Sequence, residues 1–351
     1  RARIISFTTC STVVGLALAW MPSMTMPACG RSKRICIRPF ILSGVNGLFL
    51  EIIALCHIFV IIIAYNKNRN NHEGVAFMSY QLRRVTGYIL GFVLFYAPFA
   101  LFQRSLGYML TGKWQELTIH NLCLRKPVEH VLDGGLLQFT SVSVLSLILL
   151  LVVTFFFGAI FCGKLCPAGA FTEYLSKLVP ERFKIDWSKY TEIAPIRYGM
   201  LAAFMLIPFV GGALACAYCN YYVFDLLANY AVRGYFFSMS SSLLLTAILW
   251  LVVFGLFTKG GRGYCNFLCP VGAVQNLVHY FSSQLPFVYR MQVDKSKCIG
   301  CKKCVRTCPM QAVKVQENKA EICLHNCIVC GQCAHDCPVK AISYGRDRHE
   351  K

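Results

Sequence analysis

Long apolar stretches alternate with short basic segments through the middle of this 351-residue chain. Four of the stretches approach the ~20 residues that a helix needs to cross the hydrocarbon of a bilayer. They are Val85–Phe102, Val142–Phe161, Ile196–Ala215 and Leu243–Phe257. This pattern predicts an α-helical membrane bundle of about four core transmembrane helices.

Two further apolar runs, Ile4–Trp20 and Leu48–Tyr65, lie near the N-terminus. The first suits a signal-like segment or a short span, and the second suits a marginal span, so one or two more transmembrane helices could precede the bundle. The segment that begins at Met78 reads as a cytoplasmic start before a membrane helix. Residues 1–77 are therefore predicted to be an extension outside the functional unit, and residues 78–290 the transmembrane domain.

Charges in the polar segments indicate how such a bundle would be oriented. Arg83 and Arg84 precede the first stretch, and the segment between the second and third stretches is rich in lysine. The segment between the third and fourth carries only Asp225 and Arg233. Because cytoplasmic loops are enriched in lysine and arginine, both ends and the middle segment are predicted to face the cytoplasm. The chain would then be a multi-pass protein of the prokaryotic cytoplasmic membrane, surrounded by lipid.

Composition favours a membrane environment over a nucleic-acid partner. The chain is 56% hydrophobic and only 15% charged, and its mean hydropathy is +0.53. Such apolarity is unusual for a soluble domain. The formal net charge of +19 would also suit a nucleic-acid-binding protein, but basic cytoplasmic loops explain the excess. We therefore expect no nucleic-acid partner.

Two cysteine runs near the C-terminus have the spacing C-x2-C-x2-C-x3-C-P. Three thiolates of such a run bind one iron–sulfur cube, and the fourth reaches across to the other cube. The predicted ligands of the first [4Fe–4S] cluster are Cys298, Cys301, Cys304 and Cys337. Those of the second are Cys327, Cys330, Cys333 and Cys308. A zinc site would separate its cysteine pairs more widely, and disulfides give no reason for a repeated run.

The residues around the runs are typical of the small strands of a ferredoxin. The strands are expected at Met291–Asp294, Ala312–Gln316, Ala320–Cys323 and Ala341–Tyr344. Residues 291–351 are therefore predicted to form an α+β two-cluster ferredoxin domain. Thiolate ligands must stay reduced, which agrees with the cytoplasmic side that the charge distribution predicts.

A second cysteine pattern is duplicated within the helical region. Cys162 and Cys166 follow the second apolar stretch, Cys265 and Cys269 follow the fourth, and each pair has the spacing C-x3-C-P. The proline is well placed to begin a new helix, and a thiol at a helix N-terminus is expected to have a lowered pKa. The four cysteines could ligate a further cluster or another metal, form a thiol relay, or be packed structural thiols.

Signals for other redox chemistry are weaker. Cys216 and Cys219 form a C-x-x-C after the third apolar stretch, where a disulfide, two free thiols or a redox role would all fit. No C-x-x-C-H occurs, so c-type haem is not expected. Three histidines near the predicted membrane boundaries could serve a quinone or a b-type haem, although such residues are more often interfacial. They are His120, His130 and His279.

Two C-x3-C-P motifs followed by a two-cluster ferredoxin resemble the NapH/NosR-type membrane polyferredoxins, from about Met78 to Tyr344. The chain is more similar to the NapH branch, because it has no room for the flavin-binding domain of the NosR branch. The resemblance implies an electron-transfer subunit of a quinol dehydrogenase system, which passes electrons between the quinol pool, or a cytoplasmic donor, and a partner reductase system. The alternatives are an electron donor for metal or cofactor maturation of another enzyme, as in CcoG-like relatives, and a redox-sensing membrane regulator.

Overall fold

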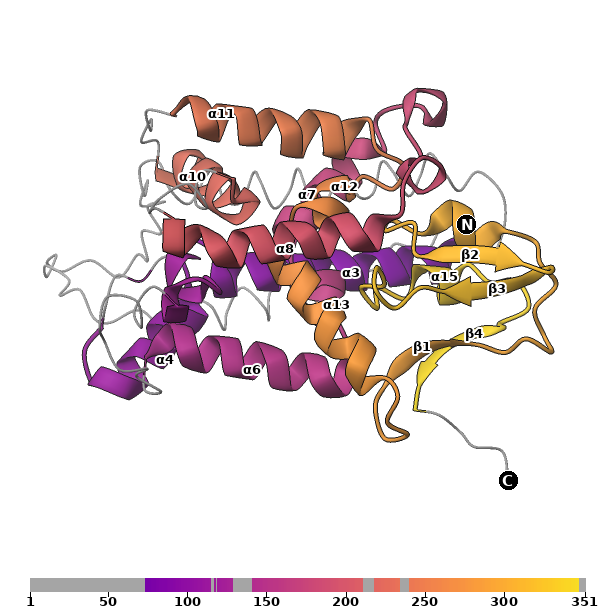
Figure 1. The fold of residues 1–351 in the computed structure, drawn as a ribbon, viewed down its shortest axis with the longest axis horizontal. Helices are drawn as coiled ribbons and strands as arrows, with labels where there is room; N and C mark the ends of the chain where they lie inside the picture. Colours follow the sequence, from indigo (N-terminus) through magenta and orange to yellow (C-terminus); the bar gives the residue numbers. More distant parts are fainter. Residues whose placement is uncertain are drawn as a thin grey trace, which may run out of the picture. The chain divides into compact units, whose positions relative to one another are not determined.

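The computed structural model describes residues 73–114, 117, 119–128, 141–210, 218–233 and 240–346, all within one compact unit. Residues 1–72, with the two N-terminal apolar runs and most of the predicted extension, lie outside the described residues. The predicted domain boundaries at residues 77/78 and 290/291 stay predictions. The described chain is mainly helical up to residue 282 and forms short strands after it (Figure 1).

Each of the four predicted apolar stretches contains helix. The α-helices of the described residues before 290 are α3 (Glu73–Phe95), α4 (Leu101–Thr111), α6 (Val142–Phe157), α7 (Pro167–Ser176), α8 (Ile193–Val210), α10 (Asn220–Arg233), α11 (Ser241–Ile248), α12 (Gly263–Phe267) and α13 (Pro270–Ser282). The 3-10 helices are η2 (Ile119–Leu122), η4 (Glu181–Phe183) and η5 (Trp187–Lys189), and the π-helices are η3 (Phe161–Leu165) and η6 (Leu249–Leu256).

The ends of these helices contradict the predicted membrane bundle. Ala100, in the left-handed region, separates α3 from α4, so the first apolar stretch is broken. α6 has 16 residues and ends at Phe157, where it is capped by Gly158, whose φ of 75° is readily adopted only by glycine. The fourth stretch is divided between the eight-residue α11 and the π-helical η6. Among the described residues, no helix is both long enough and apolar enough to cross a membrane. The prediction of a transmembrane bundle with multi-pass topology is therefore wrong, because counting apolar residues does not register these breaks.

The helical region consists of two similar halves that pack across one another. In each half an apolar helix leads through a π-helix and a cysteine pair into a helix that begins with proline. The first half is α6, η3 and α7, and the second is α11, η6, α12 and α13. α13 packs against α6, and α7 packs against η6, so the proline-led helix of each half lies against the other half. This cross-packing brings the two cysteine pairs together.

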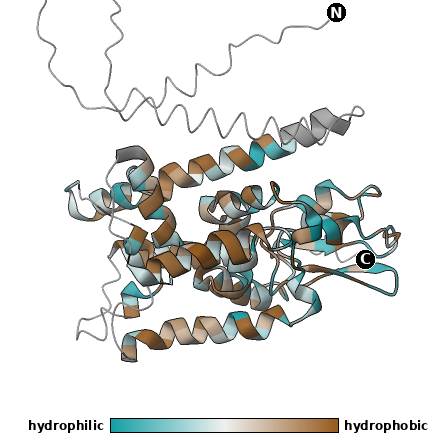
Figure 2. Cartoon of the chain, turned by 90° about the horizontal axis from the view of Figure 1, so that it is seen from above, coloured by the Kyte–Doolittle hydropathy of each residue, from teal (hydrophilic) through white to brown (hydrophobic). Residues whose placement is uncertain are grey.

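The outward faces of three helices remain apolar. Large exposed side chains lie on α6, α8 and α11, among them Leu149, Leu206 and Leu244. Figure 2 shows brown, hydrophobic positions along the helices and teal, hydrophilic positions gathered around the C-terminal strands. Apolar faces of this kind are typical of surfaces that another molecule covers.

Two antiparallel ribbons and two short helices form the C-terminal region. The strands are β1 (Arg290–Val293), β2 (Val313–Gln316), β3 (Lys319–Ile322) and β4 (Ile342–Gly345), and β1 pairs with β4 while β2 pairs with β3. Glu317 and Asn318, both left-handed, form the two-residue turn between β2 and β3. Helices α14 (Lys303–Thr307) and α15 (Gln332–His335) follow the two cysteine loops. The four predicted strands are confirmed, each displaced by one residue or less at either end.

Candidate iron–sulfur centres

A small cavity lies between the loop after β1, helix α14 and the turn before β4. Four cysteines line it, together with apolar residues such as Val315 and Ala320. The cysteines are Cys298, Cys301, Cys304 and Cys337. The structure therefore groups the four residues that the spacing predicts for the first cluster, and their ligation of iron stays a prediction.

A second small cavity contains the other predicted set. Its cysteines are Cys308, Cys327, Cys330 and Cys333. Met291, Met310 and Ile328 supply apolar walls. Each run thus contributes three cysteines to one cavity and one cysteine to the other, which is the crossed arrangement of a two-cluster ferredoxin.

Backbone amides are directed at cysteine sulfur atoms in both cavities. The N–H groups of Ala320, Ala312 and Ala341 donate to Cys298, Cys308 and Cys337 over 3.4, 3.3 and 3.3 Å, respectively. Backbone hydrogen bonds from Gly300 and Ala320 lower the pKa of Cys298, since they stabilise the thiolate. Four cysteines around each cavity, with donors at their sulfur atoms, fit a [4Fe–4S] cluster. Such a cluster, when bound, supplies one-electron redox chemistry.

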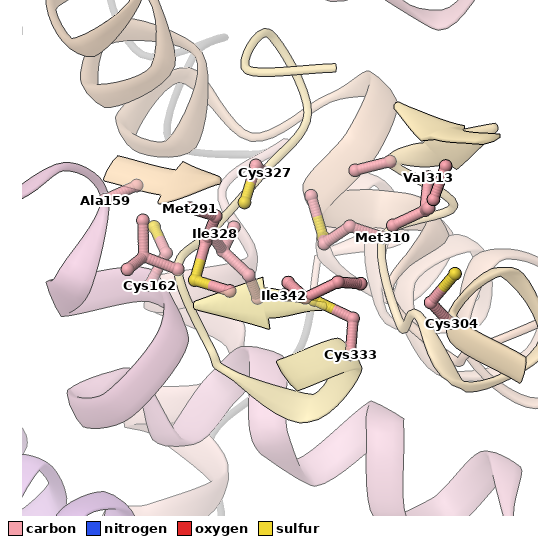
Figure 3. Close-up of a cluster of buried hydrophobic side chains, with 13 residues drawn as sticks. Ala159, Cys162, Met291, Cys304, Met310, Val313, Cys327, Ile328, Cys333 and Ile342 are labelled. Carbon is pink, nitrogen blue, oxygen red and sulfur yellow. The ribbon is translucent and has the colours of Figure 1, made fainter. Parts of the chain in front are cut away.

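The two cysteine loops differ in exposure. Cys301 is exposed, and the neighbouring Ile299 side chain is 64% exposed. Cys327 is buried, and Ile328 packs in one hydrophobic cluster with Cys162 of the helical region (Figure 3). The first loop therefore faces solvent, whereas the second faces the helices.

Hydrogen bonds attach the second loop to the helical region. The Asn276 side chain of α13 donates to the carbonyl groups of Leu324 and Cys327 over 2.6 and 2.8 Å. The Tyr80 hydroxyl of α3 donates to the carbonyl of Cys330 over 2.8 Å. Because buried carbonyl groups are costly to leave without a donor, these bonds determine how the second loop sits against the helices.

A buried network of ion pairs also supports the contact between the second cysteine loop and the helical region. Glu173 forms ion pairs with Arg84 and Arg262 at 2.9 and 2.7 Å. Arg84 also donates to the Gln332 side chain of α15 over 3.1 Å. Burial alone would raise the pKa of Glu173, but the two arginines lower it to about 2. The network joins the helical region to the second cysteine loop and holds two cations against one carboxylate.

The four C-x3-C-P cysteines meet between the two halves. Pro167 and Pro270 begin α7 and α13, which confirms that each proline starts a helix. A Cβ atom on Gly169 of α7 would lie 3.3 Å from the Cys265 sulfur, so the first motif packs directly on the second. Cys166 and Cys269 share one hydrophobic cluster.

The pKa values of these thiols differ from the expectation. Burial raises the pKa of Cys162, and neighbouring Cys166, Cys269 and Cys265 raise it further. Burial also raises the pKa of Cys269, and that of Cys265 to about 12. The predicted lowering at helix N-termini is therefore wrong for these three thiols, because lost hydration outweighs the favourable field of the helix.

An apolar cavity of about 230 Å³ lies beside this group of cysteines. Aromatic and aliphatic side chains from α3, α4, η2, α6, η3, α8 and α10 line it, and Val271 of the second motif takes part. Tyr221 lines the cavity and also places its hydroxyl 3.6 Å from the Cys166 sulfur. His120 and Tyr222 supply polar groups at the wall, with ring centroids 4.7 Å apart.

The C-x-x-C cysteines and the three histidines lie in different parts of the chain. Cys219 lines the apolar cavity, as does His120. Cys216 and His130 lie outside the described residues. His279 is fully buried away from this cavity, and burial followed by Arg290 lowers its pKa to about 4. The structure therefore brings one of the three histidines to a ligand-sized cavity.

Several polar side chains around the C-x3-C-P cysteines could not be recognised from a motif. They are Arg197, Tyr221, Arg262 and Gln275. Arg262 lies three residues before Cys265, but the first motif has Ala159 at the matching position, so the repeat gives no signal for it.

Two family models match this chain. A "4Fe-4S binding domain" matches residues 140–186 and 242–286, which contain the two C-x3-C-P motifs. A "4Fe-4S dicluster domain" matches residues 290–338, which contain the two cysteine runs. No solved structure matches the chain.

Curated relatives match about half of the chain. YccM of Escherichia coli K12 is 25% identical over 51% of this chain and 49% of its own length. The ferredoxin-type protein NapH of Haemophilus influenzae is 29% identical over 43% and 47%. The regulatory protein NosR of Pseudomonas aeruginosa is 26% identical over 47% and 22%. The chain thus spans about half the length of YccM and NapH, and less of NosR.

These matches support an iron–sulfur protein of the ferredoxin type. The matched domains contain both the two cysteine runs and the two C-x3-C-P motifs. The fold brings the cysteines of these patterns together in three groups. The two domain matches and the relatives named NapH and NosR support a polyferredoxin of the NapH/NosR type.

Proposed function

We propose that the chain passes single electrons between a quinol bound in the apolar cavity and a redox partner protein that docks at the exposed first cysteine loop. The observation that carries the proposal is the sequence of contacts from cavity to surface. Tyr221 lines the cavity and contacts Cys166. Cys162 packs with Ile328 of the second cysteine loop. The first loop, with Cys301, then reaches solvent.

The apolar cavity suits a quinol in size and chemistry. Its wall is mostly aromatic and aliphatic, with a few polar groups, which is typical of a site for a small apolar ligand. Oxidation of one quinol releases two electrons and two protons. His120 at the wall is a suitable first acceptor for a proton, because a neutral imidazole has one ring nitrogen that can accept it. The two electrons leave one at a time.

The surface around the first cysteine loop, where electrons would leave the protein, is suited to an acidic partner. Four exposed lysines surround the first cysteine loop and α14: Lys295, Lys297, Lys302 and Lys303. Positive charge of this kind accelerates the encounter with a negatively charged protein surface. Exposed Ile299 adds an apolar contact at the centre of the same surface. We therefore propose that this surface is the docking site for the partner.

Quinol oxidation tests the proposal directly. Purified, anaerobic protein is mixed with a reduced short-chain quinol analogue, and bleaching of cluster absorbance is followed by stopped flow. We expect bleaching in the wild-type protein. In Val153→Trp, which fills the cavity, bleaching by the quinol should be lost while reduction by dithionite persists.

The matched control lies one residue away on the same helix. Val152 is 48% exposed and does not line the cavity, so Val152→Trp should react with the quinol at the wild-type rate. Equal quinol rates for Val153→Trp and the wild-type protein would exclude the cavity as the quinol site.

A further inference from the structure

We propose that Val329, in the second cysteine loop, keeps water away from the iron–sulfur cluster of the second cavity. It thereby holds the midpoint potential of this cluster below the value that glycine at the same position would give. The inference goes beyond the proposed function, because it concerns the surroundings of one cluster and holds for any electron donor. It rests on the backbone conformation of the loop, the packing of the Val329 side chain and the polar atoms behind that side chain.

The residue before the second cysteine of each run has a left-handed backbone. In the first loop this residue is Gly300, with a φ of 67°, and in the second loop it is Val329, with a φ of 52°. The N–H of Gly300 donates to Cys298, and the N–H of Val329 donates to Cys327. The two loops therefore use the same backbone geometry to direct an amide at the first cysteine of the run.

Valine is an unfavourable residue for this conformation, whereas glycine is a favourable one. A β-branched side chain crowds its own backbone when φ is positive, so Val329 is strained. Glycine adopts such values freely. Strain of this kind persists only where the surrounding structure holds the residue in place, and it concentrates at functional sites. The Val329 side chain is therefore expected to have a role that glycine could not perform.

The Val329 side chain fills a space between the second loop and the helical region. Val329 is buried but does not line the second cavity, so its side chain lies on the other side of the loop. A Cβ atom on Gly158, which caps α6, would lie 2.9 Å from both Val329 Cγ2 and His279 Nε2. Gly158 thus leaves the room in which Val329 and His279 of α13 come together.

The matching position of the first loop is packed differently. A Cβ atom on Gly300 would lie 2.5 Å from the carbonyl oxygen of Asn318, in the turn between β2 and β3. The neighbouring Ile299 side chain is largely exposed. Glycine therefore allows the first loop to approach a turn of its own region, whereas valine connects the second loop to the helices.

Polar atoms behind Val329 would bind water if the side chain were absent. His279 is fully buried, and neither of its ring nitrogens has a hydrogen-bond partner among the described residues. A water molecule is held in a buried space that is large enough and that offers it two or more polar partners. Removal of the valine side chain would open such a space, with the His279 ring and the peptide groups of the loop as partners. Val329 therefore occupies the place that a water molecule would take.

Exclusion of water affects the potential through charge. A cluster held by four thiolates gains a further negative charge on reduction, and nearby water stabilises that charge better than apolar packing does. Admission of water should therefore raise the midpoint potential of the second cluster. The ion pairs of Glu173 with Arg84 and Arg262 remain in a Val329 variant, so they do not contribute to the change.

A redox titration followed by paramagnetic resonance tests the inference. The anaerobically purified full chain is reduced with dithionite, and the signal of the second cluster is recognised by its absence from Cys327→Ser. In Val329→Gly this signal should shift to a more positive midpoint potential. Lys302→Gly is the matched control, because Lys302 is also left-handed, with a φ of 60°, but is exposed. Glycine there frees the backbone without opening a buried space, so the signal of the second cluster should not shift.

Deuterium couplings measure the water itself. After exchange into D2O, pulsed electron–nuclear double resonance of Val329→Gly should detect deuterons near the second cluster that the wild-type protein lacks. The inference requires both the positive shift and the additional deuterons. The absence of either in Val329→Gly would overturn it.

Two further variants separate water from strain and from loss of the cluster. Val329→Ala keeps a Cβ atom, and should shift the same signal in the same direction by a smaller amount. It decides the question if Val329→Gly loses its second cluster, and an unshifted signal in Val329→Ala would then overturn the inference. In Val329→Gly/His279→Leu the water loses its ring partner, so the shift should be smaller than in Val329→Gly. An equal shift would show that relief of strain moves the potential, and would also overturn the inference.

These outcomes are independent of the quinol test. Because dithionite is the reductant, a lack of quinol-dependent bleaching would reject the proposed donor and leave the role of Val329 intact. An unshifted potential in Val329→Gly together with quinol-dependent bleaching would reject the role of Val329 and leave the proposed function intact.

Discussion

The two C-terminal cysteine loops have the same spacing but different surroundings. The first, residues 298–304, carries exposed Cys301 and the largely exposed Ile299. The second, residues 327–333, contains buried Cys327 and Cys333 and is bonded to α3 and α13. Identical ligand spacing therefore leads to one site open to a partner and another sealed against the helices. What distinguishes them is packing from distant parts of the chain.

This difference in packing distinguishes the two cysteine loops, although their ligand spacing is the same. The helical region supplies hydrogen bonds and an ion network to the second loop, and comparable hydrogen bonds or ion pairs to residues 298–304 are not seen among the described residues. The second loop is therefore the internal neighbour and the first loop the external one.

Loss of a ligand should affect the two loops unequally. Cys327→Ser removes a buried ligand that solvent cannot replace, so we expect loss of about four irons and at least a ~100-fold slower transfer from quinol to an external acceptor. Cys301→Ser is exposed, and water can complete its site, so most of the iron should remain. Metal analysis with steady-state turnover checks both. Equal iron loss in the two variants would remove the contrast.

Glu173→Gln should weaken the support behind the second loop. Replacing the carboxylate by an amide leaves Arg84 and Arg262 buried without an anionic partner. This costs about 3 kcal/mol of unfolding free energy. Guanidinium unfolding at neutral pH measures this cost. Glu321→Gln, at an exposed ion pair with Lys295, should leave the unfolding midpoint nearly unchanged.

The pH dependence of the same variant has a defined sign. The pKa of Glu173 is about 2 in the folded chain, below the value of about 4.3 for an unfolded glutamate. Its stabilising contribution is therefore complete above about pH 4.3 and declines as the pH falls towards the folded pKa. Glu173→Gln should lack this acid-dependent loss. A wild-type slope in the variant would mean that another carboxylate is responsible.

Asn276→Leu should loosen the second loop alone. It leaves the carbonyl groups of Leu324 and Cys327 without their side-chain donor, a cost of about 2 kcal/mol. Hydrogen exchange should become faster in residues 324–332 and stay unchanged in residues 298–304, which serve as the internal control. Faster exchange in both segments would show that the loops are not independently supported.

Charge removal at the first loop should have the smallest effect. Lys302→Gln/Lys303→Gln should slow reoxidation by anionic ferricyanide a few-fold at low ionic strength and lose this effect in high salt. Reoxidation by cationic hexaammineruthenium(III) should not slow. If both oxidants slowed equally, the lysines would act on cluster stability and not on approach.

Features that depend on residues close together in sequence were predicted correctly more often than features that depend on distant contacts. The spacing of the cysteine runs identified the two sets that line the ferredoxin cavities, since short loops decide which thiols can meet. Pro167 and Pro270 correctly marked the starts of α7 and α13, and the four strands followed from short segments. Each of these features depends on residues close together in sequence.

The rest depends on contacts that no local pattern contains. Apolar content predicted transmembrane helices, but left-handed Ala100 separates α3 from α4 and Gly158 caps the end of α6. The position of Arg197 against the second motif results from the packing of α8 on α12 and α13. Burial of Cys162 likewise reversed the expected pKa shift, because burial is decided by the whole fold.

The central claim is that electrons from the cavity pass through the second cysteine loop before they reach the first. Anaerobic stopped-flow mixing of Cys327→Ser with a reduced quinol analogue tests it most directly. We predict that the first cluster of this variant is still reduced by dithionite and is no longer reduced by the quinol. Reduction of the first cluster by the quinol at the wild-type rate would contradict the account.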